Sequence, residues 1–304
     1  MLRTQIAELK SFLKDKNAPF GIDLLLPQVG GNARKTNMDY TKGQLPELID
    51  IIIAEKASLF VSAVGIPPKW AVEKLHGAGI LCMNMIGHPK HAVKALEVGV
   101  DIICAQGGEG GGHTGEVPSS ILWAAAVDSV KDKLSPFTGK QVEVVAAGGI
   151  SDSRGLAMAL SAGCSAVWVG TRFIVSKEAG APPRHQQAVL NANLTDTIRT
   201  IIYTGRPMRV LKTEYIDSWE NGRPNEIKEL TSRGIIPAYD DIEKKKKSGI
   251  EMTFQDQLNM TPLLMGKVAG VITGETPSAK EIIDEMVGGA VQILKRNSAM
   301  VSKL

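Results

Sequence analysis

The chain has 304 residues, of which 43% are hydrophobic and 22% charged, the composition of an ordinary soluble enzyme with one large core or two modest ones. Its formal net charge is only +3, and its dense basic run, Lys244–Lys247, has no interleaved aromatic residues, so we expect no nucleic-acid partner. No apolar run approaches the roughly 18 residues that cross a bilayer, and we expect neither a membrane span nor a secretory signal. The three cysteines lack metal-ligand spacing, so we expect a reducing compartment and no metal site.

A regular alternation of helical and strand patterns fills the first half of the chain, beginning with a helical pattern over residues 2–13. Short apolar runs ended by Gly or Pro predict six strands, at 20–26, 59–64, 80–86, 100–105, 142–147 and 165–169. Helical patterns separate them, at about 45–57, 68–77, 88–98, 119–133 and 152–162. Helices that alternate with continuously apolar strands predict a parallel sheet covered by helices.

Two architectures have this alternation, a (β/α) barrel and a doubly wound sheet. In a doubly wound dinucleotide fold the glycine-rich turn follows the first strand, whereas here glycine loops follow the last three predicted strands. Barrels commonly build a phosphate site from the loops after strands seven and eight. We therefore predict an α/β fold of the TIM-type (β/α) barrel in residues 1–180, with 142–147 and 165–169 as its seventh and eighth strands.

Counting back from these two strands makes 20–26 the third strand, so strands one and two of the barrel are predicted to be missing. A complete six-stranded fold is the alternative. From about residue 172 the alternation stops, and a mostly helical second domain or lid is predicted over residues 181–304. Its helical patterns lie at 184–192, 194–202, 226–247, 254–260 and 278–296.

The loop over residues 105–115, AQGGEGGGHTG, follows the strand at 100–105 and holds six glycines within nine residues. Glycine lets a backbone take positive φ values and approach a ligand closely. His113 lies in this loop at the carboxyl end of a strand, where barrel enzymes place their active sites. A neutral imidazole there can take a proton from an acidic carbon or donate a hydrogen bond to a developing negative charge. A histidine that only braces the loop is the alternative.

Polar groups and glycines at neighbouring strand ends are candidates for binding a phosphorylated ring. Gln106 and Asn84 offer amide groups for the polar edge of a ring, although either can instead satisfy buried backbone. Glycines after the last two strands allow peptide N–H groups to point at phosphate oxygens, and the Thr171 hydroxyl follows them. These glycines are Gly148, Gly149 and Gly170.

Several polar residues close to these positions are expected to play structural parts. Asp152 is expected to cap the helix that follows it, and Glu109 to be a solvated loop carboxylate rather than an acid or base. His88 and His91 have no third metal ligand nearby in the sequence, so surface or capping roles are expected for them.

Three motifs in this order, AQGGEGGGHTG, AAGGI and VWVGTRF, followed by PPRHQQAV, resemble the nitronate monooxygenase family, also called 2-nitropropane dioxygenases. The resemblance implies a barrel that binds FMN noncovalently, a helical second domain and His113 as the catalytic base. Such enzymes oxidise alkyl nitronates, typically propionate 3-nitronate, with O2 to a carbonyl compound and nitrite. The residues at matching positions, which would contact FMN, are Gln106, Gly111, Gly149, Trp168, Val169, Gly170 and Thr171.

The chain departs from the family pattern in two places. Members usually begin with a strand that bears an Ala-Pro-Met-like segment lining the flavin, and this sequence has none. Gly110 stands where alanine is commoner. Two alternatives therefore stay open, a flavin-dependent enoyl reductase of the same superfamily and an inactive, flavin-free barrel fragment that acts as a binding module. The oligomeric state is not indicated.

The last three residues, Ser302-Lys303-Leu304, match the C-terminal address that the peroxisomal import receptor reads. In a eukaryote they predict peroxisomal localisation. In any other organism we expect the cytoplasm.

Overall fold

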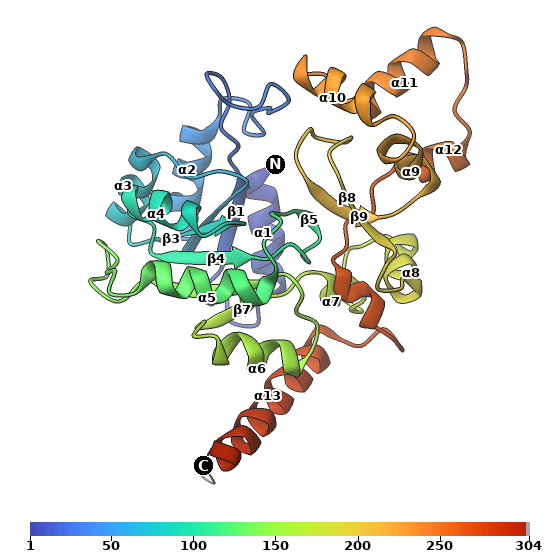
Figure 1. Cartoon of the computed structure of the whole chain (residues 1–304). Coiled ribbons are helices and arrows are strands. Elements are labelled where there is room, and N and C mark those ends of the chain that lie inside the picture. The colour runs from blue at the N-terminus through green and yellow to red at the C-terminus, as the bar shows by residue number, and fades with distance from the viewer. Residues whose placement is uncertain (302–304) are drawn as a thin grey trace.

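A six-stranded parallel sheet organises the first half of the chain in the computed structural model, which describes residues 1–301 (Figure 1). Its strands are β1 (Gly21–Leu25), β2 (Leu59–Ala63), β3 (Leu81–Ile86), β4 (Ile102–Gln106), β6 (Glu143–Ala147) and β7 (Ala166–Trp168). All six predicted strands are confirmed, with ends shifted by two residues at most. The address Ser302-Lys303-Leu304 lies outside the described residues, so peroxisomal import stays a prediction.

The strands lie side by side in the order of the sequence, β1-β2-β3-β4-β6-β7. A doubly wound sheet contains a point where the strand order reverses, and this sheet contains none, so the winding is that of a (β/α) barrel. β1 and β7 are its two edges, which makes the sheet an open half-barrel. The two additional strands that would close it stay a prediction.

Helices join successive strands and cover the outer face of the sheet. They are α1 (Leu2–Phe12), α2 (Leu45–Ala54), α3 (Lys69–Gly77), α4 (Lys90–Glu97), α5 (Ser119–Val130) and α6 (Ser153–Ser161). Because side chains alternate along a strand, each strand presents one set of residues to these helices and another to the inside of the half-barrel. Phe60 and Cys82 pack in the outer core, whereas Val61, Met83 and Cys104 form a separate inner cluster.

The second half of the chain combines short helices with a small antiparallel sheet of order β5-β9-β8. The sheet contains β5 (Gly112–His113), β8 (Thr197–Thr200) and β9 (Met208–Leu211). The helices are α7 (Thr171–Ile174), α8 (Pro183–Asn191), α9 (Glu214–Glu220), α10 (Pro224–Ser232), α11 (Pro237–Lys247), α12 (Phe254–Met260), the 3-10 turn Lys267–Val271 and α13 (Ala279–Val301). Figure 1 shows α9 to α12 gathered beside the β8–β9 pair, away from the parallel sheet. A domain division at residue 180 stays a prediction.

The predicted helix at 194–202 is wrong, because residues 197–200 form strand β8. Apolar residues at 194, 198 and 202 gave the segment a helical spacing. The segment is also rich in β-branched residues, which favour strands, and β8 pairs along its length with β9. Pairing with the next strand of the chain therefore decided its structure.

The C-terminal helix α13 packs against α6 and then extends away from the body of the protein, as Figure 1 shows. Ile282, Met286 and Ala290 form its buried stripe, at the i, i+4 and i+8 positions expected for one helical face. Within residues 1–301, no helix combines the length and apolarity needed to cross a bilayer.

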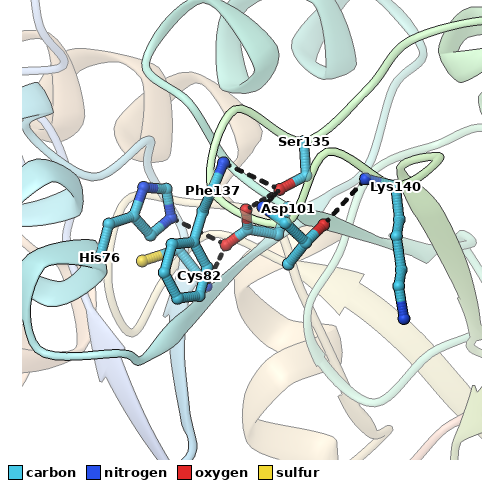
Figure 2. A network of polar contacts seen from close by, with 7 residues as sticks. His76, Cys82, Asp101, Ser135, Phe137 and Lys140 are labelled. Carbon is cyan, nitrogen blue, oxygen red and sulfur yellow. Dashed lines mark hydrogen bonds and ion pairs between the residues drawn. The ribbon is translucent and has the colours of Figure 1, made fainter.

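A buried carboxylate joins several elements at the amino-terminal edge of the parallel sheet (Figure 2). Asp101, which is 3% exposed and precedes β4, accepts hydrogen bonds through Oδ2 from the Cys82 backbone N–H at 2.7 Å and through Oδ1 from the Ser135 hydroxyl at 2.6 Å. Its Oδ2 also lies 2.9 Å from Nε2 of His76, whose ring stacks on Phe137. A carboxylate this buried is tolerated because both of its oxygens are bonded.

Replacing this carboxylate should therefore destabilise the fold. Asp101→Ala leaves the Cys82 N–H, the Ser135 hydroxyl and the His76 imidazole without their acceptor, and we expect it to lower the free energy of unfolding by about 3 kcal/mol in urea titrations. Asp50→Ala is the matched control, because Asp50 is an exposed carboxylate paired with Lys74, and it should change stability by less than about 0.5 kcal/mol. Equal losses in the two variants would contradict this role of Asp101.

Candidate functional site

A single cavity lies at the carboxyl ends of β4, β6 and β7, with a volume of about 240 Å³. The loops after these three strands share it. The predicted site residues that line it are Gln106, Gly111, Gly148, Gly149, Trp168, Gly170 and Thr171. Val169 and His113 are not among its lining residues. The sequence-based expectation that these three strand ends share one rim is therefore met, whereas the role of each residue toward a cofactor stays a prediction.

Glycine at position 148 is required by the close approach of two loops. Gly148 has a φ of +80°, and a Cβ atom there would lie 2.8 Å from the Gly107 carbonyl oxygen. Gly149 follows with a φ of +73°. Within residues 1–301, the peptide N–H groups of Gly148 and Gly149 have no acceptor in the protein. Two consecutive glycines in this conformation thus leave backbone donors free at the wall of the cavity.

Glu109 joins the glycine loop to the start of α5. Its Oε2 accepts a hydrogen bond from the Ser119 backbone N–H at 2.9 Å, and the Ser119 hydroxyl lies 2.7 Å from the same oxygen. The Ser119 hydroxyl also lies 2.9 Å from the Gly148 carbonyl oxygen. The expectation of a solvated loop carboxylate is therefore wrong: Glu109 satisfies a free N–H group at a helix start and fixes the two loops to each other.

Asp152 caps α6 as expected, because its Oδ1 accepts hydrogen bonds from the backbone N–H groups of Arg154 and Gly155. The N–H groups of Arg154 and Gly155 are therefore not available to a ligand.

The far wall of the cavity comes from the segment 264–268, which the sequence analysis did not identify. Leu264, Gly266 and Val268 line the cavity. The Gly266 N–H donates to the Thr171 hydroxyl oxygen at 2.9 Å, so the hydroxyl proton of this buried threonine remains free to donate. Lys267 donates its backbone N–H to the Glu109 carbonyl oxygen at 2.9 Å. No local pattern marks this segment, because its contacts reach residues about a hundred positions earlier in the chain.

His113 occupies β5, which pairs antiparallel with β9 so that His113 faces Met208 in the register. Gln106 donates from Nε2 to the His113 carbonyl oxygen at 2.6 Å, which means that its amide nitrogen braces the loop. The Nδ1 atom of His113 is buried and has no hydrogen-bond partner. Burial lowers the pKa of His113 below its ordinary value, the Pro207 carbonyl opposes this, and the positive charge of Arg206 adds to the lowering. The imidazole is therefore neutral near pH 7, with one nitrogen available.

Asn84 does not reach the cavity. It alternates with Met83 and Met85 along β3 and shares a strand face with Cys82 and Ile86, which pack beneath the helices. The Asn84 amide group donates to the Ser62 carbonyl and hydroxyl oxygens, at 3.0 and 2.8 Å, and to the Gly65 carbonyl oxygen at 2.8 Å. The expectation that Asn84 projects into the barrel mouth is therefore not met. Its contacts fit the alternative, in which its amide group bonds to buried backbone groups.

The structure brings His76, Cys82 and Asp101 close enough to be considered as metal ligands, with ligand atoms within 4.8 Å of one another (Figure 2). Both Asp101 oxygens already accept hydrogen bonds there, and burial and the charge of Asp101 raise the pKa of the Cys82 thiol. We read the cluster as a structural network. His88 and His91 lie beside each other at the start of α4, with ring centroids 5.9 Å apart.

A methyl group at Gly148 should disrupt the packing of two loops against each other. Gly148→Ala places a Cβ atom against the Gly107 carbonyl in addition to straining the backbone, and we expect it to lower the free energy of unfolding by about 2 kcal/mol more than Gly139→Ala does. Gly139 is the matched control, because it also has a positive φ, +67°, but no atom lies within 4 Å of its Cβ position. The measurement is chemical denaturation of both variants, and an equal loss in each would remove the packing argument.

The pKa of His113 generates a second prediction. An unfolded histidine titrates near its ordinary pKa of about 6.5, and the folded His113 titrates lower, so between these two values the unfolded state binds more protons. The contribution of His113 to stability is thus lost as the pH falls below about 6.5. NMR titration of the histidine ring signals, assigned with His113→Asn, should place His113 below the ordinary value. A pKa at or above it would show that the ring is not desolvated.

Comparison with known proteins gives the family to which the sequence is similar. The sequence profile described as nitronate monooxygenase matches residues 1–289. A putative monooxygenase of Mycobacterium tuberculosis is 36% identical over 211 residues, which is 69% of this chain and 54% of that protein. The (3aS,4S,5R,7aS)-5-hydroxy-7a-methyl-1-oxo-octahydro-1H-indene-4-carboxyl-CoA dehydrogenase of the same organism is 31% identical over 285 residues, 83% of this chain and 77% of that protein.

The fold agrees as well. The structure of FabK from Thermotoga maritima superposes with a TM-score of 0.74 at 24% identity, over 98% of this chain and 83% of that one. The chain thus spans about half of the first of these curated relatives and most of the solved neighbour. With the profile matching nearly its whole length, the chain belongs to the nitronate monooxygenase family, whose members are oxidoreductase enzymes.

Proposed function

We propose that the protein binds FMN and oxidises alkyl nitronates of the propionate 3-nitronate type with O2, giving a carbonyl compound and nitrite. The observation that carries this proposal is the common cavity at the ends of β4, β6 and β7, beside the glycine loop that holds His113. Membership of the nitronate monooxygenase family supports the reaction class. The substrate, the products and the identity of the flavin as FMN are parts of this proposal.

The residues that are present fit the phosphate-bearing end of a flavin nucleotide. The cavity of about 240 Å³ is smaller than the ~300–1,000 Å³ of typical small-molecule sites, so it suits one end of FMN rather than the whole molecule. Free N–H groups at Gly148 and Gly149, and the hydroxyl proton of Thr171, offer donors to phosphate oxygens. Trp168, which is 37% exposed, lies at the rim with an apolar surface for the remainder.

When bound, the flavin supplies the electron transfer between substrate and O2. The protein's own part is to hold the substrate and to manage its proton. A nitronate is already an anion and needs no base. A neutral nitroalkane must first lose a proton from carbon, and we propose that the neutral imidazole of His113, whose Nδ1 atom has no hydrogen-bond partner, accepts it.

The parallel sheet of this half-barrel is open at both edges in residues 1–301. β1 and β7 each present an unpaired edge, and two more strands, as predicted from the barrel count, would close the sheet and supply the missing Ala-Pro-Met-like segment.

A flavin-dependent enoyl reductase is the second candidate. It is favoured by the similarity to a dehydrogenase that is named for a CoA-linked substrate. A reductase requires a nicotinamide donor, whereas a nitronate monooxygenase requires only its substrate and O2. The third reading, a flavin-free binding module, requires neither.

Two measurements on the purified protein separate these candidates. We expect flavin absorbance near 450 nm, and nitrite release from propionate 3-nitronate without added nicotinamide. His113→Asn should reduce turnover of neutral nitroalkanes by at least about 100-fold while changing nitronate turnover much less, since only the neutral substrate needs a base. Equal losses on the two substrates would contradict the assignment of His113. Absence of flavin would favour the binding module. NADH-dependent reduction of an enoyl thioester would favour the reductase.

A further inference from the structure

A half-buried arginine lies two residues before the pairing partner of the proposed base. Arg206 is in the connection between β8 and β9, two residues before Met208, the residue that pairs with His113. Its charge contributes to lowering the pKa of His113, so the two side chains are within electrostatic reach of each other. Sequence analysis gave no reason to select it.

Two neutral oxygens hold the guanidinium in place. Arg206 donates from Nε to the Asn37 side-chain oxygen at 2.9 Å and from Nη1 to the Val64 carbonyl oxygen at 2.8 Å. These contacts fix the plane of the group from the loop after β1 and from the end of β2, and they leave Nη2 without a bond to the protein in residues 1–301.

This cation has no carboxylate partner in the described part of the chain. The charged and titratable groups that act on it are Arg34, Tyr40 and His113, and burial together with Arg34 lowers its pKa. Charged groups that are taken out of water are ordinarily paired. An oriented, unpaired guanidinium beside a neutral imidazole is suited to an anion that comes from outside the protein.

The backbone beside Arg206 is itself unusual. Val64, whose carbonyl the arginine binds, has a φ of +70°, a conformation that β-branched residues rarely adopt. Strained residues of this kind persist where the surrounding structure holds them, and they concentrate at ligand sites. The Val64 carbonyl is thereby directed to Nη1, at the same end of the sheet as His113.

We propose that Arg206 binds the two oxygens of the substrate's nitro or nitronate group and, with His113, forms an oxyanion subsite. This inference rests on the proposed function and names the group that its site recognises. One N–H group of Nη1 and both N–H groups of Nη2 remain, and this end of the planar guanidinium matches a planar pair of oxygens. With a neutral nitroalkane, the carbon–hydrogen bond breaks, the proton moves to His113 Nδ1, and the electron pair passes into the nitro group, where Arg206 stabilises the charge.

The test uses inorganic nitrate, a planar oxyanion, and needs no flavin and no turnover. Nitrate is titrated into the purified protein, and binding is followed by the ring signals of His113 in NMR spectra. We expect saturable shifts in the wild type and at least about tenfold weaker binding in Arg206→Gln, because a charge-assisted bond is lost. Arg233→Gln, a change at an exposed cation paired with Glu229, is the control and should leave the affinity unchanged.

Two more variants separate binding from bracing. Asn37→Ala removes the contact at Nε but keeps the charge, so it should alter nitrate affinity much less than Arg206→Gln. If Arg206→Gln does not fold, Arg206→Lys decides, with about fivefold weaker binding expected because the planar fork is lost. Unchanged affinity in either Arg206 variant, or a wild type whose His113 signals do not respond, would overturn the proposal. Failure of nitronate turnover alone would count against the proposed reaction and not against this subsite.

Discussion

The pairing of β5 with β9 is the constraint on which the site depends. A loop with this many glycines has no conformation of its own, since glycine loses more backbone freedom on folding than any other residue. Two residues of it, Gly112 and His113, are fixed by the ladder to Arg209 and Met208. The side chain of Arg209 then donates from Nε to the Gly108 carbonyl oxygen at 3.0 Å. The second half of the chain thus positions the loop that the first half carries.

The polar groups at the two ends of the parallel strands differ in how completely they are hydrogen-bonded. At the amino-terminal edge, Asp101 and its partners satisfy one another fully and contribute to stability. At the carboxyl edge, polar groups are left with unused capacity: the N–H groups of Gly148 and Gly149, the Nδ1 atom of His113 and one nitrogen of Arg206. The Nδ1 atom of His113 is the one of these that is buried without a partner, which costs free energy unless a ligand completes its bonding.

The sequence was sufficient to predict the parallel sheet, because short apolar runs that are bounded by glycines and alternate with helical patterns are typical of buried parallel strands. It also predicted the three loops of the cavity, since Gly148 and its neighbours mark places where the backbone comes close. The errors came from contacts that the local pattern of residues does not show. Residues 197–200 form a strand because they pair with β9. Glu109 forms hydrogen bonds with Ser119. Asn84 was misplaced by one step of strand register, which is enough to move a side chain to the opposite face.

Arg206 and Gly266 were missed for a related reason. Arg206 is held by Asn37 and Val64, which lie more than a hundred residues earlier in the chain. Gly266 is held by Thr171. No periodicity or motif of one sequence encodes such contacts. Local patterns therefore identified the framework and the flexible positions, whereas the partners that give those positions their chemistry became visible only in three dimensions.

The most direct test of the central claim is a crystal structure of the protein soaked or grown with FMN. We expect the phosphate within hydrogen-bonding distance of the Gly148 and Gly149 N–H groups and the Thr171 hydroxyl, and the flavin ring extending past Trp168 toward His113. Density for the phosphate at another place on the protein, or a ring on the side of the sheet away from His113, would contradict it.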